Sequence, residues 1–398
     1  MAARICLLAA LLPASASAQG WTEASVARLA AERAPAVREA WAAAERARGA
    51  AEGAGLLPNP SIAWERQEAF DPNAQTQDIL TARIPIDLSG RPAAERALAD
   101  LDALAAEATA ESARSLAVAV ALEAFYGALA AERRAELLVG AQATLDEAGR
   151  VMERRRAAGE ASGYAEARLA LEAELARSQL AESRVAASAQ RAALAALLGV
   201  DETPGLVGDL DATAPAPIEA LLARAEARGD VAALDRADAA ASRAADAAGW
   251  AWVPRLDVEG GYNRVDGPVP GHGYAVGVAI EVPLFDHGQG PRARASAARA
   301  AIAAVREATL ARARAQIRAA HAQLEGLRAE RARFAEATGA AAELLATAAT
   351  SGYREGERSL VELLDARRAV VENAQRRLAL DLAVRLADVR LRGATGDL

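Results

Sequence analysis

The sequence predicts a mainly α-helical chain that carries two β-hairpins and is built by duplication of one unit. In residues 84–92, Pro85 and Gly90 occur five residues apart, and the same pair recurs 198 residues later as Pro283 and Gly288. Each copy ends a stretch of alternating polar and apolar residues and opens a long stretch rich in Ala, Arg and Glu. The chain is 53% hydrophobic but only 4% aromatic, a composition typical of long helices in close contact. A strand that leads into a long helix, twice at one spacing, indicates a duplicated architecture.

Residues 1–18 predict a signal peptide for secretion. Arg4 precedes a short apolar stretch, and the small residues 16–18 form a cleavage site. A short buried helix is the alternative. The formal net charge of −8 argues against nucleic acid as a partner. No later stretch offers the roughly 20 uncharged apolar residues of a membrane helix, so a membrane location would require strands.

The first repeat, residues 19–199, begins with short helices at 21–33 and 36–53, which Pro58 and Pro60 end. A β-hairpin is predicted at about 61–86, because residues 61–70 and 77–86 alternate in polarity. Strands of this length, apolar on one face, suit a hairpin that spans a bilayer with about 9–11 residues per strand. An ordinary hairpin on a soluble domain is the alternative.

A long helical hairpin follows at about 90–198. Its first helix would be on the order of 100 Å long at ~1.5 Å per residue. Leu138, Leu145 and Met152 recur at intervals of seven, as in a coiled coil. Residues 158–163 break the helix, and a second helix returns at 164–198. Residues 200–217, which are rich in proline, form a linker.

The second repeat, residues 218–398, follows the same order. Short helices are predicted at 218–228 and 231–248, and a β-hairpin at about 255–283. The long helical hairpin at about 291–392 has one helix at 291–350, a break at 351–359 and a return helix at 360–392.

Four amphipathic strands per chain cannot close a barrel, because small barrels need about eight. An open sheet in lipid would leave the hydrogen-bonding groups of its edges unpaired. A membrane location therefore requires several copies that share one barrel, and polar inward positions imply a water-filled lumen.

With these features in this order, the chain resembles the TolC-type outer-membrane efflux proteins. The resemblance rests on the duplication, the two hairpins, the motif at residues 57–60, the two helix breaks and the segment 353–366. It implies a homotrimer whose 12-stranded β-barrel continues as an α-helical barrel. It also implies three further partners: a periplasmic adaptor, an inner-membrane pump of the resistance-nodulation-division type and outer-membrane lipid. The implied location is the outer membrane of a Gram-negative bacterium, with a long periplasmic extension.

The resemblance also assigns a periplasmic gate to Tyr353, Arg358, Glu362 and Asp365. Glu362 and Asp365 are three residues apart and share a helix face, and a symmetric ring of carboxylates favours cations. The alternative is a solvated helix end. In the first repeat, Ala165 stands where the family offers a carboxylate.

Three further groups of residues are expected to have roles. The tips of the helical hairpins are expected to contact the adaptor, although turns are needed in any helical hairpin: Gly159, Glu160, Ser162, Gly356, Glu357 and Ser359. The junctions between strand and helix are expected to act as hinges: Pro85, Gly90, Pro283 and Gly288. Aromatic residues on the strands are expected at the membrane interface: Trp64, Tyr262 and Tyr274.

The sequence does not predict an enzyme. The three histidines are scattered, without Cys or paired carboxylates at ligand spacing, so neither a metal site nor a cofactor is expected. The leading hypothesis is a passive exit duct of a tripartite efflux system. The short chain and compact loops favour the heavy-metal and cation efflux branch of the family. The alternatives are a periplasmic coiled-coil scaffold and the exit duct of a type I protein secretion system.

Overall fold

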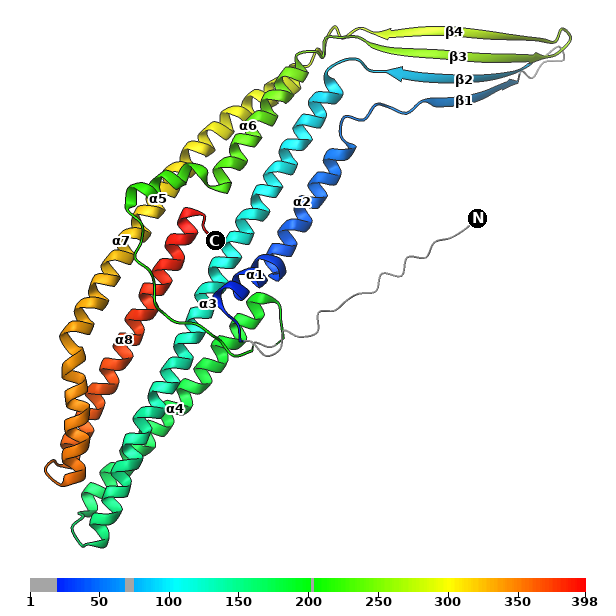
Figure 1. Cartoon of the computed structure of the whole chain (residues 1–398). Helices are drawn as coiled ribbons and strands as arrows, with labels where there is room; N and C mark the ends of the chain where they lie inside the picture. The colour runs from blue at the N-terminus through cyan, green and yellow to red at the C-terminus, as the bar shows by residue number, and fades with distance from the viewer. Residues whose placement is uncertain (1–19, 69–74, 202–203) are drawn as a thin grey trace, which may run out of the picture. The chain divides into compact units, whose positions relative to one another are not determined.

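The computed structural model describes residues 20–68, 75–201 and 204–398. The predicted signal peptide and the turn of the first hairpin therefore lie outside the described residues. The chain is mostly helical with one small sheet (Figure 1). Its elements in chain order are α1 (Glu23–Arg33), α2 (Pro35–Gly53), β1 (Ser61–Glu68), β2 (Thr76–Ile86), α3 (Arg91–Ala157), α4 (Gly163–Leu198), α5 (Ile218–Arg224), the 3-10 helix η1 (Ala225–Ala227), α6 (Gly229–Ala248), β3 (Arg255–Asp266), β4 (Gly271–Glu281), α7 (Gln289–Glu355) and α8 (Leu360–Thr395).

Two compact units make up the chain, and each draws on both predicted repeats. Of the described residues, unit 1 contains 20–38, 113–201, 204–225 and 313–398, and unit 2 contains 39–68, 75–112 and 226–312. The long helices α3 and α7 each contribute to both units. The repeat boundaries stay a prediction from the sequence.

Unit 2 contains a single antiparallel sheet with the strand order β1-β2-β3-β4, so β1 and β4 are its edges. The two predicted hairpins are thus joined side by side through β2 and β3. Arg48 of α2 donates to Glu107 of α3 at 2.7 Å, and Arg306 of α7 donates to Asp235 of α6 at 2.7 Å. Each short helix is therefore fastened to the first part of the long helix in its own repeat.

Unit 1 contains the two long helical hairpins, α3–α4 and α7–α8, and three apolar clusters. One lies near the hairpin turns and includes Leu145, Met152 and Leu364, which agrees with the predicted spacing of seven. Another packs α1 against α3, α4 and α8 around Phe125. The third packs α5 against α7 and α8 around Ile317.

A network of polar side chains in unit 1 fastens the N-terminal helix to the C-terminal helix. The Tyr126 hydroxyl and the Arg385 guanidinium each donate to Glu23 at 2.6 Å, and Arg392 also donates to Glu23. The Arg385 guanidinium lies 4.6 Å from the centroid of the Tyr126 ring. These bonds satisfy a partly buried carboxylate that would otherwise be costly to remove from water.

Helix α3 contains a stretch that is long and apolar enough, by length and composition alone, to cross a membrane. Val118, Leu122 and Phe125 are buried in the apolar cluster around α1. The core of unit 1 therefore accounts for one side of this stretch, whereas Leu116 and Val120 are exposed.

Several element boundaries differ from the sequence prediction. Helix α7 ends at Glu355 rather than at residue 350, and the predicted break at 351–359 is confined to Gly356 and the residues after it. Gly352 lies inside the predicted break but within α7, because a glycine in a helix interior only weakens the helix. Within the second predicted hairpin, β3 ends at Asp266 and β4 begins at Gly271, so the turn between them is residues 267–270. Helix α8 extends to Thr395 because Gly396, with a φ of 82°, provides its cap.

Candidate functional site

Both long helical hairpins turn at a glycine whose backbone is left-handed. Gly159 has a φ of 75° and Gly356 a φ of 86°, a conformation that glycine adopts without strain. Ser162 then caps α4 by accepting from the Ala165 amide, and Ser359 caps α8 by accepting from the Glu362 amide. The structure thus places the predicted tip residues in two turns of matching construction.

The carboxylates of the turns are not equivalent. Glu160 and Glu357 are exposed. Glu362 is also exposed, but it accepts hydrogen bonds from the Ser359 amide at 2.8 Å and from the Ser359 hydroxyl at 2.9 Å, which completes a capping box. The bond from the Ser359 backbone is the main cause that lowers the pKa of Glu362. Glu362 is therefore ionised and held by its own helix start.

Tyr353, a predicted gate residue, lies in the core of the tip. Its side chain is 2% exposed, and burial raises the pKa of its hydroxyl. That hydroxyl has no hydrogen-bond partner among the described residues. Ala161 and Ala165 pack against the cluster that contains Tyr353. Both are alanines, which cannot satisfy the hydroxyl.

The ring of Tyr353 is covered by Arg155, which the sequence reasoning missed. The Arg155 guanidinium lies 4.7 Å from the ring centroid, and its Nη2 donates to the Tyr353 carbonyl at 2.7 Å. Arg155 belongs to the last turn of α3, so these contacts join the two hairpin tips within one chain. Arg354 adds an ion pair with Glu147 of α3 at 3.7 Å. Arg155 is one of three consecutive arginines, and nothing in that run distinguishes it from its neighbours.

The other two predicted gate residues are at the surface. Arg358 pairs with Glu362 at 3.3 Å. Its side chain also lies over Gly352, where an added Cβ would come within 2.8 Å of the Arg358 Cγ. Asp365 is exposed, and its charge helps to raise the pKa of Arg168 on α4, although the hydrogen bond with Tyr164 is the main cause. The structure therefore places the four residues at one tip, but not in one contact network.

Two more arginines join the hairpins behind the turns. Arg368 of α8 forms an ion pair with Glu172 of α4, and Glu172 is 8% exposed. Arg367 donates to the Ala141 carbonyl of α3 at 3.2 Å, and its burial lowers the pKa of its guanidinium. Because the charged partners lie on α3, α4 and α8, any separation of the two hairpin tips must break these contacts as well.

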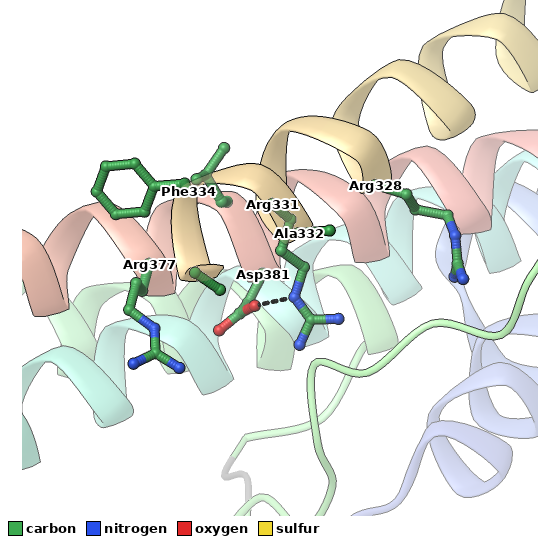
Figure 2. A pocket seen from close by; sticks show the side chains of 8 residues that line it. Arg328, Arg331, Ala332, Phe334, Arg377 and Asp381 are labelled. Carbon is green, nitrogen blue, oxygen red and sulfur yellow. Dashed lines mark hydrogen bonds and ion pairs between the residues drawn. The ribbon is translucent and has the colours of Figure 1, made fainter. Parts of the chain in front are cut away.

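A groove between α7 and α8 has a volume of about 260 Å³ and is lined by three arginines and Asp381 (Figure 2). Arg331 donates to Asp381 at 2.5 Å and to Asp211 of the linker at 2.8 Å. Arg328 donates to the linker carbonyl of Ala212 at 2.7 Å. We interpret Arg328 and Arg331 as anchors of the linker, because both guanidinium groups donate hydrogen bonds to linker residues.

The predicted hinge glycines of unit 2 both pack against the end of α6. An added Cβ at Gly90 would collide with the Ala247 carbonyl. At Gly288, whose φ is 88°, a Cβ would come within 2.6 Å of the Ala248 carbonyl. Pro85 lies within β2 and Pro283 follows the end of β4. The two glycines are therefore required by close packing at the start of each long helix.

The predicted interface aromatics lie in one row across the sheet. Trp64 is opposite Leu80, Leu80 is opposite Tyr262, and Tyr262 is opposite Tyr274. We call these four residues the aromatic row. Their side chains share a face because directly opposite residues in antiparallel strands point the same way. Toward the helices, this face continues with large apolar side chains that are exposed: Ile62, Ile84, Val276, Val278 and Ile280.

The other face of the sheet carries small and polar side chains. Ala63, Thr81, Gly261 and Ala275 form one row of it. In the next row, Arg83 pairs with Glu259. The sheet therefore has one apolar face, one polar face and two unpaired edges.

Comparison with known proteins finds one matching family model. The model of the outer membrane efflux protein family matches residues 221–397. Residues 221–397 are therefore similar to this family, in agreement with the resemblance drawn from the sequence. This family consists of channels and not of enzymes, in agreement with the expectation from the sequence. Among its curated relatives is the cobalt-zinc-cadmium resistance protein CzcC of Cupriavidus metallidurans, which is 28% identical over 323 residues, or 80% of this chain and 76% of CzcC.

Solved structures of outer-membrane channels share the fold of this chain. The match to CusC has a TM-score of 0.70 at 17% identity and covers 94% of this chain and 92% of CusC. The outer membrane protein VceC of Vibrio cholerae matches with a TM-score of 0.69 at 20% identity, over 94% and 96% of the two chains. The MtrE outer membrane channel of Neisseria gonorrhoeae matches with a TM-score of 0.70 at 19% identity, and the match covers 94% of this chain and 88% of MtrE.

Proposed function

We propose that the chain is the outer-membrane exit duct of a tripartite efflux system. It conducts substrate passively from an inner-membrane pump and a periplasmic adaptor to the outside. The observation that carries this proposal is the sheet, whose large apolar side chains are exposed on one face while its other face is small and polar. Such a sheet suits a barrel wall between lipid and a water-filled lumen.

The unpaired edges β1 and β4 support an assembly of three copies. Lipid offers no hydrogen bonds to edge groups, so β4 of one copy must pair with β1 of the next until the ring closes. Three copies would give a 12-stranded barrel and continue as an α-helical barrel made from the long hairpins. Four strands alone are too few to close.

The tip of α7–α8 is the periplasmic entrance in this proposal, with Tyr353, Arg358, Glu362 and Asp365 as its gate. The turns at Gly159 and Gly356 contact the adaptor through the exposed Glu160 and Glu357. Arg155 adds a link between the two tips of each chain. Its contacts with Tyr353 support a gate that opens by separation of the hairpins.

Divalent metal cations are the proposed substrates. The support is the relative CzcC, a cobalt-zinc-cadmium resistance protein that aligns with 80% of this chain. The pump that supplies them is proposed to be of the resistance-nodulation-division type. A strain that expresses pump and adaptor together with this chain should retain less zinc than one without it, as measured by metal analysis of washed cells. Equal zinc retention would contradict the metal assignment.

Surface labelling tests the topology. Val269, in the β3–β4 turn, is 76% exposed, and a cysteine there should react with an impermeant thiol reagent on intact cells. The matched control is Glu357→Cys at the exposed helical tip, which should react only after the outer membrane is permeabilised. Protection of Val269→Cys on intact cells would contradict a membrane-spanning hairpin.

A further inference from the structure

A row of charged side chains lies directly beyond the aromatic row on the same face of the sheet. Arg66 is opposite Asp78, Asp78 is opposite Arg264, and Arg264 is opposite His272. Each of these residues is two positions from a member of the aromatic row, so all four share its face. We call them the headgroup row.

Three members of the headgroup row, Arg66, Arg264 and His272, are exposed, and Asp78 is half-buried. The Arg66 side chain is 49% exposed and pairs with Asp78 at 3.6 Å. The Arg264 side chain is 62% exposed and donates through Nε to Asp266 at 3.1 Å. That bond uses one of the five donors of a guanidinium. The His272 ring lies 6.4 Å from the Tyr262 ring, which connects this row to the aromatic row.

The two ends of the apolar face differ. At the end nearer the helices, the corresponding row is Ile86, Leu256 and Ile280, and it carries no charge. Charged residues therefore follow the aromatic residues only at the end of the sheet that holds the β3–β4 turn. Aromatic rings mark the level of lipid headgroups, and a row two residues further along a strand lies about 7 Å beyond it.

We propose that the headgroup row binds the phosphate groups of lipids in the outer leaflet. This inference rests on the proposed duct, which places the β3–β4 turn outside the cell. Arginine recognises phosphate with two parallel hydrogen bonds. Its aliphatic stem lies along apolar surface while its charge reaches the headgroups. The carboxylates of Asp78 and Asp266 hold the two guanidiniums in place on the sheet surface, and repetition of the row in each copy would surround the barrel with phosphate sites.

Binding of lipopolysaccharide by the purified full chain in neutral detergent tests the proposal. The double variant Arg66→Ser and Arg264→Ser should bind lipopolysaccharide at least about tenfold more weakly, since each arginine near an anionic lipid surface is worth about fivefold. The matched control is Arg83→Ser, because Arg83 lies on β2 of the same sheet but on the polar face, and this variant should bind like the wild type. Native mass spectrometry across a titration gives both affinities.

Four outcomes would overturn the inference. The double variant could bind as tightly as the wild type, or the Arg83→Ser control could lose as much affinity as the double variant. Inorganic phosphate at the same concentration of phosphate groups could displace the lipid, which would make this a site for free anions. A chain that forms conducting channels but does not prefer lipopolysaccharide to phosphatidylcholine refutes the lipid site and leaves the duct intact. A chain that binds lipopolysaccharide but does not conduct contradicts the duct instead.

Discussion

Unit 1 and unit 2 differ in how deeply their large apolar side chains are buried. In unit 1, large residues such as Phe125, Leu122 and Leu364 are fully buried among the helices. Among the described residues of unit 2, the buried apolar positions are all alanine apart from Val231, while Trp64, Val276 and Ile280 are more than half exposed. Unit 1 therefore has an interior of its own, whereas unit 2 places its large apolar surface where another molecule must cover it.

This difference indicates which part of the chain depends on its surroundings. When several large apolar side chains are exposed next to one another, they mark a surface that contacts a membrane or another protein. The helices of unit 2 pack through alanine, which permits close approach but buries little area per residue. We therefore expect substitutions in unit 1 to act on the isolated chain and substitutions in unit 2 to act on insertion and assembly.

The largest effect is expected in the core of unit 1. Phe125→Ala should lower the free energy of unfolding by about 3–5 kcal/mol, because it removes a buried ring and leaves a cavity. The matched substitution in unit 2 is Trp64→Ala. Trp64 is 64% exposed, so this variant should lose far less unfolding free energy in detergent. Thermal unfolding of the two purified variants followed by circular dichroism measures both. Equal losses would contradict the contrast between the units.

The next effect concerns the two faces of the sheet. Val278→Arg puts a charge in the middle of the apolar face, which costs about 2–4 kcal/mol where that face meets lipid. The control is the adjacent Ala279→Arg, whose side chain points to the opposite face. The first variant should be depleted from the outer-membrane fraction and the second retained. Depletion of both to the same extent would mean that neither face meets lipid.

Much of the fold follows from the sequence because its signals are local. The alternation around Val276 and Val278, the prolines at 58 and 60, and the glycines at 159 and 356 specify strands, helix ends and turns from neighbouring residues alone. The joining of the two hairpins into one sheet depends on pairing between residues about 180 positions apart, such as Leu80 and Tyr262, which no local pattern encodes.

The candidate site was predictable only in part. Position along the chain identified the tip, and the capping box of Ser359 and Glu362 has a sequence signature. The role of Arg155 has no sequence signature, because its partner Tyr353 is 198 residues away along the chain. The expected break at Gly352 was wrong because the residues around it maintain the helix, and Gly356 is where a left-handed backbone is needed.

A smaller effect is expected at the tip of unit 1. Arg155→Ala removes a cation–π contact worth about 0.5–2 kcal/mol and a bond to the Tyr353 carbonyl. It should raise the exchange rate of amide hydrogens in residues 353–360, as measured by mass spectrometry. Tyr353→Phe should have almost no effect on exchange, because the lost hydroxyl has no hydrogen-bond partner among the residues that the structure describes. A larger effect for Tyr353→Phe would show that its hydroxyl bonds to another copy.

The smallest effect concerns the pH dependence of unit 1. Burial alone would raise the pKa of Glu23, but hydrogen bonds from Tyr126 and Arg392 outweigh it and lower the pKa below 4.5. A carboxyl whose pKa is lower in the folded state stabilises the fold above its unfolded pKa, and this contribution is lost as pH falls through the folded pKa. The wild type should therefore lose stability below pH 4.5 more steeply than Glu23→Gln. Glu32→Gln, an exposed site on the same helix, should keep the steep profile in thermal unfolding scans.

Electrical recording in planar lipid bilayers tests the proposed duct most directly. The purified wild-type protein, which we expect to be a trimer by native mass spectrometry, should form pores of one stable conductance. Arg358→Ser and Arg155→Ala should each raise that conductance by loosening the tip. Glu362→Ala combined with Asp365→Ala should weaken block by divalent cations. A stable monomer that inserts with its strands intact but carries no current would contradict the account.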